Sequence, residues 1–164
     1  MPTKVSAGAV IFRQDDTRQY LLLERARRKS GYWDFPRGNV EKNETPWLTA
    51  RREIREETGI EDIRFIPGFS EKICYYYKTD RSAIMREVLF LLAETETEKV
   101  VLSYEHTGFE WLDYRRAYER ITHRSSKSVI EKAERLLSTL KNYDLAPCDS
   151  ILSQLDPHRD TGSI

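Results

Sequence analysis

A group of carboxylates between residues 38 and 60 is the part of the chain best suited to chemistry. On a helix, Glu53 lies four residues from Glu57 and three from Glu56, so the three side chains share one face. Like charges on one face repel one another unless divalent cations lie between them. Carboxylate oxygens suit a hard ion such as Mg²⁺ or Mn²⁺. The spacing therefore predicts a metal site. A solvated helix with arginine–glutamate pairs is the alternative, but it would account for one pair of neighbouring glutamates and not for this whole arrangement.

The residues on either side of these carboxylates predict where the helix begins and ends. Thr45 suits the N-cap, and Pro46 suits the first helical position, where its missing N–H is no loss. Gly59 suits a C-cap in the left-handed conformation. These signals predict a helix over residues 46–58. Gly38, before the helix, allows the backbone to come close to an ion or a phosphate.

The whole segment resembles the Nudix box, G-x5-E-x7-R-E-U-x-E-E-x-G-U, in which U is a bulky aliphatic residue. Nudix hydrolases cleave a nucleoside diphosphate linked to another moiety and use divalent metal ions. The resemblance implies attack of water on one phosphorus of a polyphosphate chain, with Mg²⁺ or Mn²⁺ as cofactor. The specified positions of the box are filled here by Gly38, Glu44, Arg52, Glu53, Ile54, Glu56, Glu57, Gly59 and Ile60.

The resemblance also implies roles for the box residues. The expected metal ligands are Glu53, Glu56 and Glu57, with the backbone carbonyl of Gly38 completing the shell. Arg52 is expected to serve catalysis by orienting Glu44 or another carboxylate through paired hydrogen bonds.

Glu105 lies outside the box, in an expected loop before a strand. In many Nudix enzymes a carboxylate in such a loop binds metal or serves as base, so Glu105 is a candidate for both roles. Glu53 and Glu56 are the other candidate bases, and geometry decides among the three. The neighbouring His106 is expected to be structural, because no Cys or His partner for a zinc site accompanies it.

Segments outside the box resemble the asymmetrical diadenosine tetraphosphate hydrolases, a Nudix subfamily. In that subfamily a tyrosine lies about sixteen to eighteen residues beyond the box, where a flat ring can stack on adenine. Tyr75 best matches this position, and Tyr77 is the alternative because both point to the same face of a strand. The resemblance extends over roughly residues 5 to 140 and rests on residues 7–12, 32–38, 102–106 and 109–112.

Four further residues are expected to contact the substrate in this subfamily. Arg86 matches a lysine that contacts phosphate, and an arginine can do so bidentately. His123 matches an aromatic residue that sandwiches the base. Tyr32 stands where the subfamily has a histidine before its tryptophan, and it could bond a phosphate or stack. Arg37, beside the box glycine, is the fourth.

The subfamily resemblance implies asymmetric cleavage of diadenosine tetraphosphate to ATP and AMP. The closest alternative is removal of pyrophosphate from the 5′ end of triphosphorylated RNA, which uses the same box. Diphosphoinositol polyphosphates are less suitable because few cations are clustered. A non-catalytic nucleotide-binding module is the remaining alternative, but such modules often lose box carboxylates that this chain keeps.

Composition limits the classes of partner. A third of the 164 residues are charged and the formal net charge is zero, which argues against a general nucleic-acid or membrane binder. A small nucleotide is the expected partner, and nucleic acid is expected only as a 5′-triphosphorylated RNA end. The basic runs at residues 25–29 and 115–116 are interpreted as solvated surface. The sequence predicts no oligomeric state.

A cytoplasmic location is expected. The chain opens directly into a strand-like segment without a secretory signal, and it has no apolar stretch long enough to span a membrane. The two cysteines show no metal-binding spacing, as in a reduced intracellular protein.

The predicted elements give an α+β protein with helices on both sides of a mixed sheet. The Nudix resemblance implies the same α/β/α sandwich. We expect one domain over residues 1–143 and a mobile tail over residues 144–164. Besides the helix at 46–58, helices are expected at 113–119 and 126–143, and strands at 5–12, 20–24, 33–35, 63–69, 71–77, 86–93 and 108–112.

Overall fold

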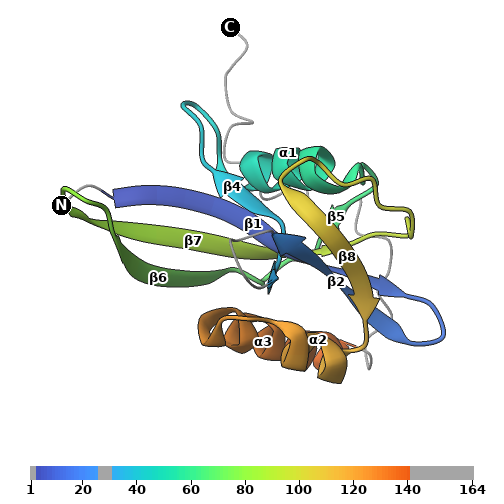
Figure 1. The fold of residues 1–164 in the computed structure, drawn as a ribbon. Helices are drawn as coiled ribbons and strands as arrows, with labels where there is room; N and C mark the ends of the chain where they lie inside the picture. The colour runs from blue at the N-terminus through green and yellow to red at the C-terminus, as the bar shows by residue number, and fades with distance from the viewer. Residues whose placement is uncertain (1–2, 26–30, 141–164) are drawn as a thin grey trace, which may run out of the picture.

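The computed structural model describes residues 3–25 and 31–140. These residues form one mixed sheet with helices on both of its faces (Figure 1). The expected α+β class and sandwich are therefore confirmed. The strands are β1 (Thr3–Gln14), β2 (Arg18–Arg25), β3 (Tyr32–Asp34), β4 (Arg37–Asn39), β5 (Arg64–Phe65), β6 (Glu71–Lys78), β7 (Ala83–Glu94) and β8 (His106–Leu112). The helices are α1 (Pro46–Thr58), α2 (Tyr114–Arg120) and α3 (Arg124–Leu140).

The long strands β1 and β7 lie side by side in parallel and form the centre of the sheet. The other pairings are antiparallel: β1 with β2 and β4, β2 with β3 and β8, and β7 with β5 and β6. Beyond the helices, β6 and β7 continue together with the start of β1 as an arm (Figure 1). The short strand β4 pairs with β1 in the sheet and also contacts α1, the carboxylate helix (Figure 1).

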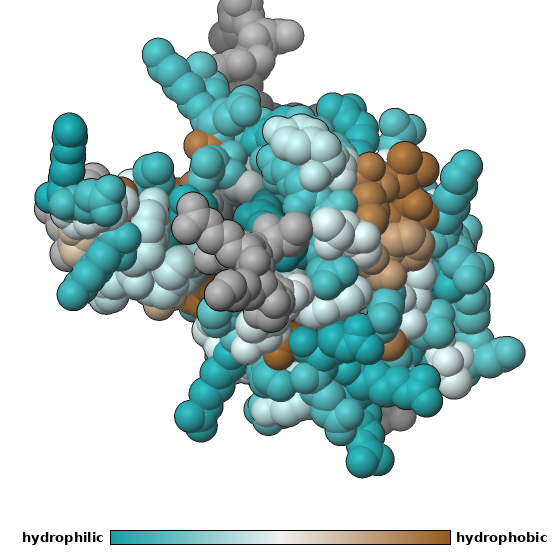
Figure 2. All heavy atoms as spheres, viewed as in Figure 1, coloured by the Kyte–Doolittle hydropathy of each residue, from teal (hydrophilic) through white to brown (hydrophobic). Residues whose placement is uncertain are grey.

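Two apolar layers hold the helices on the sheet. On one face, Ala50 and Ile54 of α1 pack against alternate residues of β1 and β2. On the other face, an apolar stripe of α3 that includes Val129 and Ile130 packs with Ala117 of α2. The face shown in Figure 2 is mostly hydrophilic, with a hydrophobic patch beside α1 and β8. No helix among the described residues is long and apolar enough to cross a membrane.

Helix α1 has the predicted bounds, and local chemistry accounts for both ends. The Thr45 hydroxyl accepts a hydrogen bond from the Leu48 N–H at 3.3 Å, and Pro46 occupies the first turn. Gly59 has φ of 73°, and its N–H donates to the Arg55 carbonyl at 2.9 Å. The helix thus starts and ends at fixed points, which sets the direction of each glutamate.

At three elements the structure departs from the prediction. The strand expected at 63–69 is only Arg64–Phe65, because Pro67 and Gly68 form a turn. Strand β4 was not predicted, since three residues are too few to show a periodicity. The last helix begins at Arg124 rather than 126, and its expected end at 143 lies outside the described residues, as does the tail 144–164.

The buried face of α1 gives a direct test of this packing. Ile54 is fully buried, so Ile54→Ala should lower the free energy of unfolding by about 2–5 kcal/mol through lost apolar contact and a cavity. Leu48→Ala on the same helix is the matched control: Leu48 is 54% exposed, so its loss should stay within about 0.5 kcal/mol. Urea unfolding followed by circular dichroism measures both. Equal losses would contradict the assigned face.

Candidate active site

Neighbouring residues of β4 point to opposite sides of the strand, and this alternation organises the site. Gly38 faces α1, where a Cβ would lie 1.8 Å from Oε1 of Glu53. On its other side, Asn39 accepts a hydrogen bond from Arg86 at 3.1 Å, and the Arg37 guanidinium lies 5.8 Å from the ring centre of Tyr75. Because residue 38 is glycine, the Glu53 carboxylate can contact one side of β4. The adjacent residues Arg37 and Asn39 direct their side chains to Tyr75 and Arg86 on the other side.

Glu57 is the most deeply buried of the box glutamates, at 2% exposure. Its Oε2 accepts a hydrogen bond from the Arg37 N–H at 3.2 Å. Among the described residues its Oε1 accepts none, although Nη2 of Arg25 lies 3.6 Å away. Burial raises the pKa of Glu57 to about 8, and the nearby charge of Glu53 adds to the effect. Burial likewise raises the pKa of Glu53.

Arg52 donates hydrogen bonds to the other three box glutamates, Glu44, Glu53 and Glu56. Its Nε and Nη2 donate to the two oxygens of Glu44 at 2.7 and 3.0 Å, which is the predicted paired hydrogen bond. Its Nη1 donates to Glu53 at 2.8 Å and to Glu56 at 3.2 Å. Hydrogen bonds from Arg52 and Thr49 lower the pKa of Glu44 to about 2. Glu56 is the outermost of these groups, with its side chain 53% exposed.

Glu105 lies across from α1, at the end of the loop that precedes β8. Arg25 of β2 joins the two sides, because its Nη2 lies 3.6 Å from Glu57 and 3.7 Å from Glu105. His106 is 9% exposed, and its Nδ1 has no hydrogen-bond partner in the described part of the chain. Burial, with the nearby Arg25 charge, lowers the pKa of His106 to about 4, so the ring is neutral at neutral pH.

The donor set fits a hard divalent cation. Oε1 of Glu57 is buried and without a hydrogen bond, it lies near Glu53, and every candidate ligand offers oxygen. No three His, Cys, Asp or Glu side chains within residues 3–25 and 31–140 are already gathered as a metal cluster. Instead, Arg52 and Arg25 each contact carboxylates that an ion would bind. A metal ion would have to compete with these arginines.

The predicted substrate residues form two groups. In the first, Arg37 contacts two of the other three residues: its guanidinium lies 5.8 Å from the ring centre of Tyr75, and its Nη2 donates to Tyr32 Oη at 2.9 Å. The Tyr32 ring meets the His123 ring edge-on at 4.9 Å. Asp34 accepts from Tyr32 at 3.1 Å and lies 3.4 Å from Arg37, which fixes both side chains.

The second group lies on the arm. Arg86 is 5.6 Å from the ring centre of Tyr77, and its Nη1 donates to Ser6 and Asn39, each at 3.1 Å. The expected alternation of the tyrosines is present, because Tyr75 and Tyr77 are half-buried and Tyr76 is exposed. Tyr75 rather than Tyr77 therefore belongs to the group that contains Arg37.

Sequence reasoning missed Arg25, Asp34 and Asn39. Arg25 begins the basic run that was interpreted as solvated surface, yet its side chain is only 33% exposed and contacts two acids. Its place at the end of an apolar strand was the available signal. Asp34 lies between two aromatic residues before the box, so its burial at 4% exposure could have been suspected.

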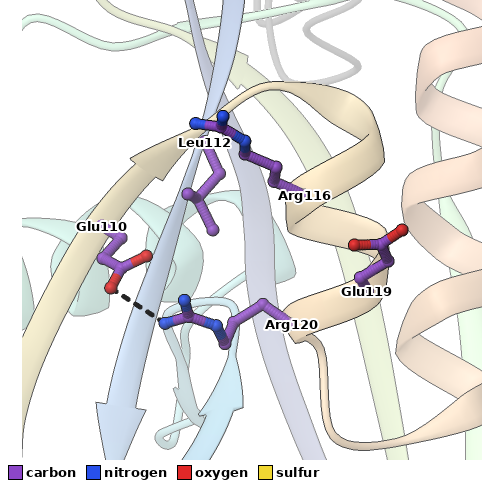
Figure 3. A pocket seen from close by; sticks show the side chains of 5 residues that line it. All are labelled: Glu110, Leu112, Arg116, Glu119 and Arg120. Carbon is purple, nitrogen blue, oxygen red and sulfur yellow. Dashed lines mark hydrogen bonds and ion pairs between the residues drawn. The ribbon is translucent and has the colours of Figure 1, made fainter.

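A larger hollow lies elsewhere. About 460 Å³ in volume, it lies between β8 and α2 and is lined by Glu110, Leu112, Arg116, Glu119 and Arg120 (Figure 3). Glu110 pairs with Arg120 at 2.9 Å, and no box residue lines it. A much smaller cavity of about 10 Å³ lies at the site itself, with Arg25, Arg37 and His106 among its lining residues. We place the candidate site beside the smaller cavity because Arg25 and Arg37, which line it, both contact Glu57.

Comparisons with known proteins were made with the whole chain. The NUDIX domain family matches residues 2–132. The asymmetrical bis(5′-nucleosyl)-tetraphosphatase of Mus musculus is 30% identical over 143 residues, covering 80% of this chain and 94% of the mouse protein. An RNA pyrophosphohydrolase of Hydrogenovibrio crunogenus is 31% identical over 97 residues, covering 50% of this chain and 59% of that protein. The crystal structure of C. elegans Ap4A hydrolase has a TM-score of 0.69 at 24% identity, covering 83% of this chain and 98% of that one.

The buried Glu57 predicts how stability of the metal-free protein depends on pH. Because its pKa is raised from 4.5 to about 8, the folded protein holds this proton more tightly than the unfolded chain does. The resulting stabilisation is complete at low pH and is lost as pH rises through about 8. Glu57→Gln removes the titration, so the wild type should lose more stability than the variant between about pH 5 and pH 8. Urea unfolding in chelator measures this, and parallel pH profiles would contradict it.

Proposed function

The chain belongs to the Nudix hydrolase family, and on this basis we propose that it hydrolyses dinucleoside polyphosphates in a reaction that requires Mg²⁺ or Mn²⁺. The proposed substrate is diadenosine tetraphosphate, with ATP and AMP as products. The observation that carries the proposal is the division of the site by β4. Acidic groups lie on one side of Gly38, and aromatic and cationic groups lie beside its neighbours, Arg37 and Asn39. A long polyphosphate with an aromatic end suits both parts.

We propose that Glu53, Glu56, Glu57 and the Gly38 carbonyl hold the cation, with Glu105 on the opposite side. When bound, the cation lowers the pKa of water and neutralises charge on the phosphates. Arg52 keeps Glu53 in place through the 2.8 Å hydrogen bond while Glu44 anchors the guanidinium from behind. The carboxylates are thus positioned before a substrate arrives, which avoids the cost of ordering them during the reaction.

Glu105 is the proposed proton acceptor. Glu53 and Glu56 each accept a hydrogen bond from Arg52, which occupies an oxygen that would otherwise be available to a proton. Glu105 lies outside that network, and its 3.7 Å contact with Arg25 is longer than a hydrogen bond. It also faces α1 from the other side of the site, so it can approach a water that the α1 carboxylates orient.

The substrate-binding end is proposed to be the first aromatic group. Tyr75 would stack on adenine, and His123, beside Tyr32, would cover the base from another side. Arg37 and Arg86 would bind phosphate oxygens. Arg37 is pre-oriented because Asp34 and Tyr32 hold its guanidinium, which lowers the entropy lost when phosphate binds.

The similarity to an RNA pyrophosphohydrolase supports a second candidate, removal of pyrophosphate from a 5′-triphosphorylated RNA. Both reactions would use the same carboxylates. The mouse tetraphosphatase matches a larger share of this chain, 80% against 50%, and so favours the dinucleotide. Incubation with Mg²⁺ and a panel of both substrate classes, followed by chromatography of the products, tests the proposal. It is contradicted if two ADP molecules form, or if triphosphorylated RNA is preferred to every dinucleotide.

Metal dependence is expected to be complete. Activity should vanish in chelator and return with Mg²⁺ or Mn²⁺, because the acidic groups alone cannot activate water or bind polyphosphate. Glu57→Gln should keep the fold yet lower turnover by orders of magnitude, since a neutral amide binds a divalent ion weakly. Steady-state assays over a range of Mg²⁺ concentrations measure the effect. Turnover near that of the wild type at saturating Mg²⁺ would remove Glu57 from the metal site.

Base stacking is expected at Tyr75. Tyr75→Ala should raise KM for diadenosine tetraphosphate more than it lowers kcat, because stacking stabilises ground and transition states alike. The expected loss is roughly 1–3 kcal/mol. Tyr76→Ala on the same strand is the matched control, since that side chain is exposed on the opposite face. A larger effect from Tyr77→Ala than from Tyr75→Ala would assign base stacking to Tyr77 instead.

A further inference from the structure

Arg25 occupies an unusual position for an arginine at the edge of a basic run. Its guanidinium lies between Glu57 on α1 and Glu105 before β8, at 3.6 and 3.7 Å. Glu57 is almost fully buried, so the Arg25 charge compensates an acid that water cannot reach. Arg25 is thus the counterion of the two carboxylates that face each other across the site.

Strand geometry directs Arg25 to this place. The pairing of β2 with β8 shifts register between Glu24 and Arg25, where Arg25 pairs with His106 instead of continuing the ladder from Gly108. The extra residue, Thr107, lies on β8, so the alternation of side chains along β2 continues through Arg25. Arg25 lies on the same face of β2 as Leu21 and Leu23, which pack in the layer of α1. Its direction toward α1 is therefore built into the sheet.

The contacts of Arg25 differ in kind from those of Arg52. Arg52 donates two short hydrogen bonds to Glu44, at 2.7 and 3.0 Å, and a third to the Asn39 carbonyl at 3.1 Å, so it is firmly anchored. Both carboxylate contacts of Arg25 exceed hydrogen-bond length. The Arg25 guanidinium can therefore leave Glu57 and Glu105 at lower cost than Arg52 can leave Glu44.

A divalent cation and the Arg25 guanidinium cannot both sit beside Oε1 of Glu57, because like charges at such separations repel strongly in a poorly hydrated site. Arg25 also lines the small cavity that contains Arg37 and Tyr32. Both are proposed phosphate or base contacts. A guanidinium released from the carboxylates would remain close to Arg37, where a bound anionic chain would supply new partners.

We propose that Arg25 is a mobile counterion that couples cation entry to polyphosphate binding. It occupies the carboxylates while the site lacks metal, and it moves to the phosphates when a cation replaces it. The second half of the proposal, movement of Arg25 to the phosphates, rests on the proposed function. The first half, competition between Arg25 and the cation, concerns the free protein and does not depend on which substrate is cleaved.

Binding of Mn²⁺ to the free protein tests the competition without any reaction. Electron paramagnetic resonance of unbound Mn²⁺ gives the dissociation constant for the wild type, Arg25→Gln and Arg25→Lys. Arg25→Gln should bind Mn²⁺ about tenfold more tightly, a typical size for coupling between sites, because the competing charge is gone. Arg25→Lys should stay near the wild type because it retains the charge. Arg64→Gln, whose partner Glu94 lies on β7 away from the carboxylates, is the matched control and should not change.

Steady-state kinetics at saturating Mn²⁺ tests the second half. Arg25→Gln should raise KM for the polyphosphate substrate while kcat falls less. Unchanged or weaker Mn²⁺ binding by Arg25→Gln, with native circular dichroism, would overturn the proposal, since it would mean that Arg25 only braces the carboxylates. Tighter Mn²⁺ binding with no change in KM would overturn the move to phosphate. A wild type that binds Mn²⁺ but cleaves no nucleotide would refute the proposed function and leave the competition standing.

Discussion

The contact between Glu53 and Gly38 is the constraint on which the site depends. With any other residue at position 38, a Cβ would lie 1.8 Å from the Glu53 carboxylate, which would have to turn away from β4. Ile54, next along the helix, is fully buried in the α1 layer, so the same helical turn is fixed by packing and by this contact. The backbone of β4 then transmits the position of α1 to Arg37, whose N–H binds Glu57. The α1 carboxylates and the proposed substrate-binding residues around Arg37 are thereby held at a fixed distance from each other.

This close packing leaves the site electrostatically incomplete without a cation. Glu53 and Glu57 both have raised pKa values, chiefly because burial removes water from their charges. The charge of Arg52 compensates Glu44, Glu53 and Glu56. The charge of Arg25 compensates Glu57 and Glu105 at longer distance. The Oε1 atom of Glu57 is buried without a hydrogen bond, which lowers the stability of the folded protein but leaves this oxygen available to a ligand. A divalent cation bound at the proposed site would relieve that cost, which would link metal binding to the stability of the fold.

The sequence predicted what local chemistry determines and missed what packing determines. Helix α1 follows from Thr45, Pro46 and Gly59, and the tyrosine faces of β6 follow from strand alternation. The pairing of Arg52 with Glu44 followed from the resemblance and is present. Strand β4 is too short to carry a pattern. The contact of Arg25 with Glu57 depends on how α1 packs on the sheet, and the contact of His123 with Tyr32 depends on how α2 meets the sheet.

A fixed separation between the stacking group and the carboxylates makes a specific claim about which phosphorus is attacked. Hydrolysis of diadenosine tetraphosphate and diadenosine pentaphosphate in ¹⁸O-labelled water, with mass spectrometry of the products, measures it most directly. If β4 sets the distance, each substrate yields ATP, and the label enters a single product at one phosphorus. Label distributed over both products, or a cleavage point that shifts when the chain is lengthened, would contradict a fixed separation.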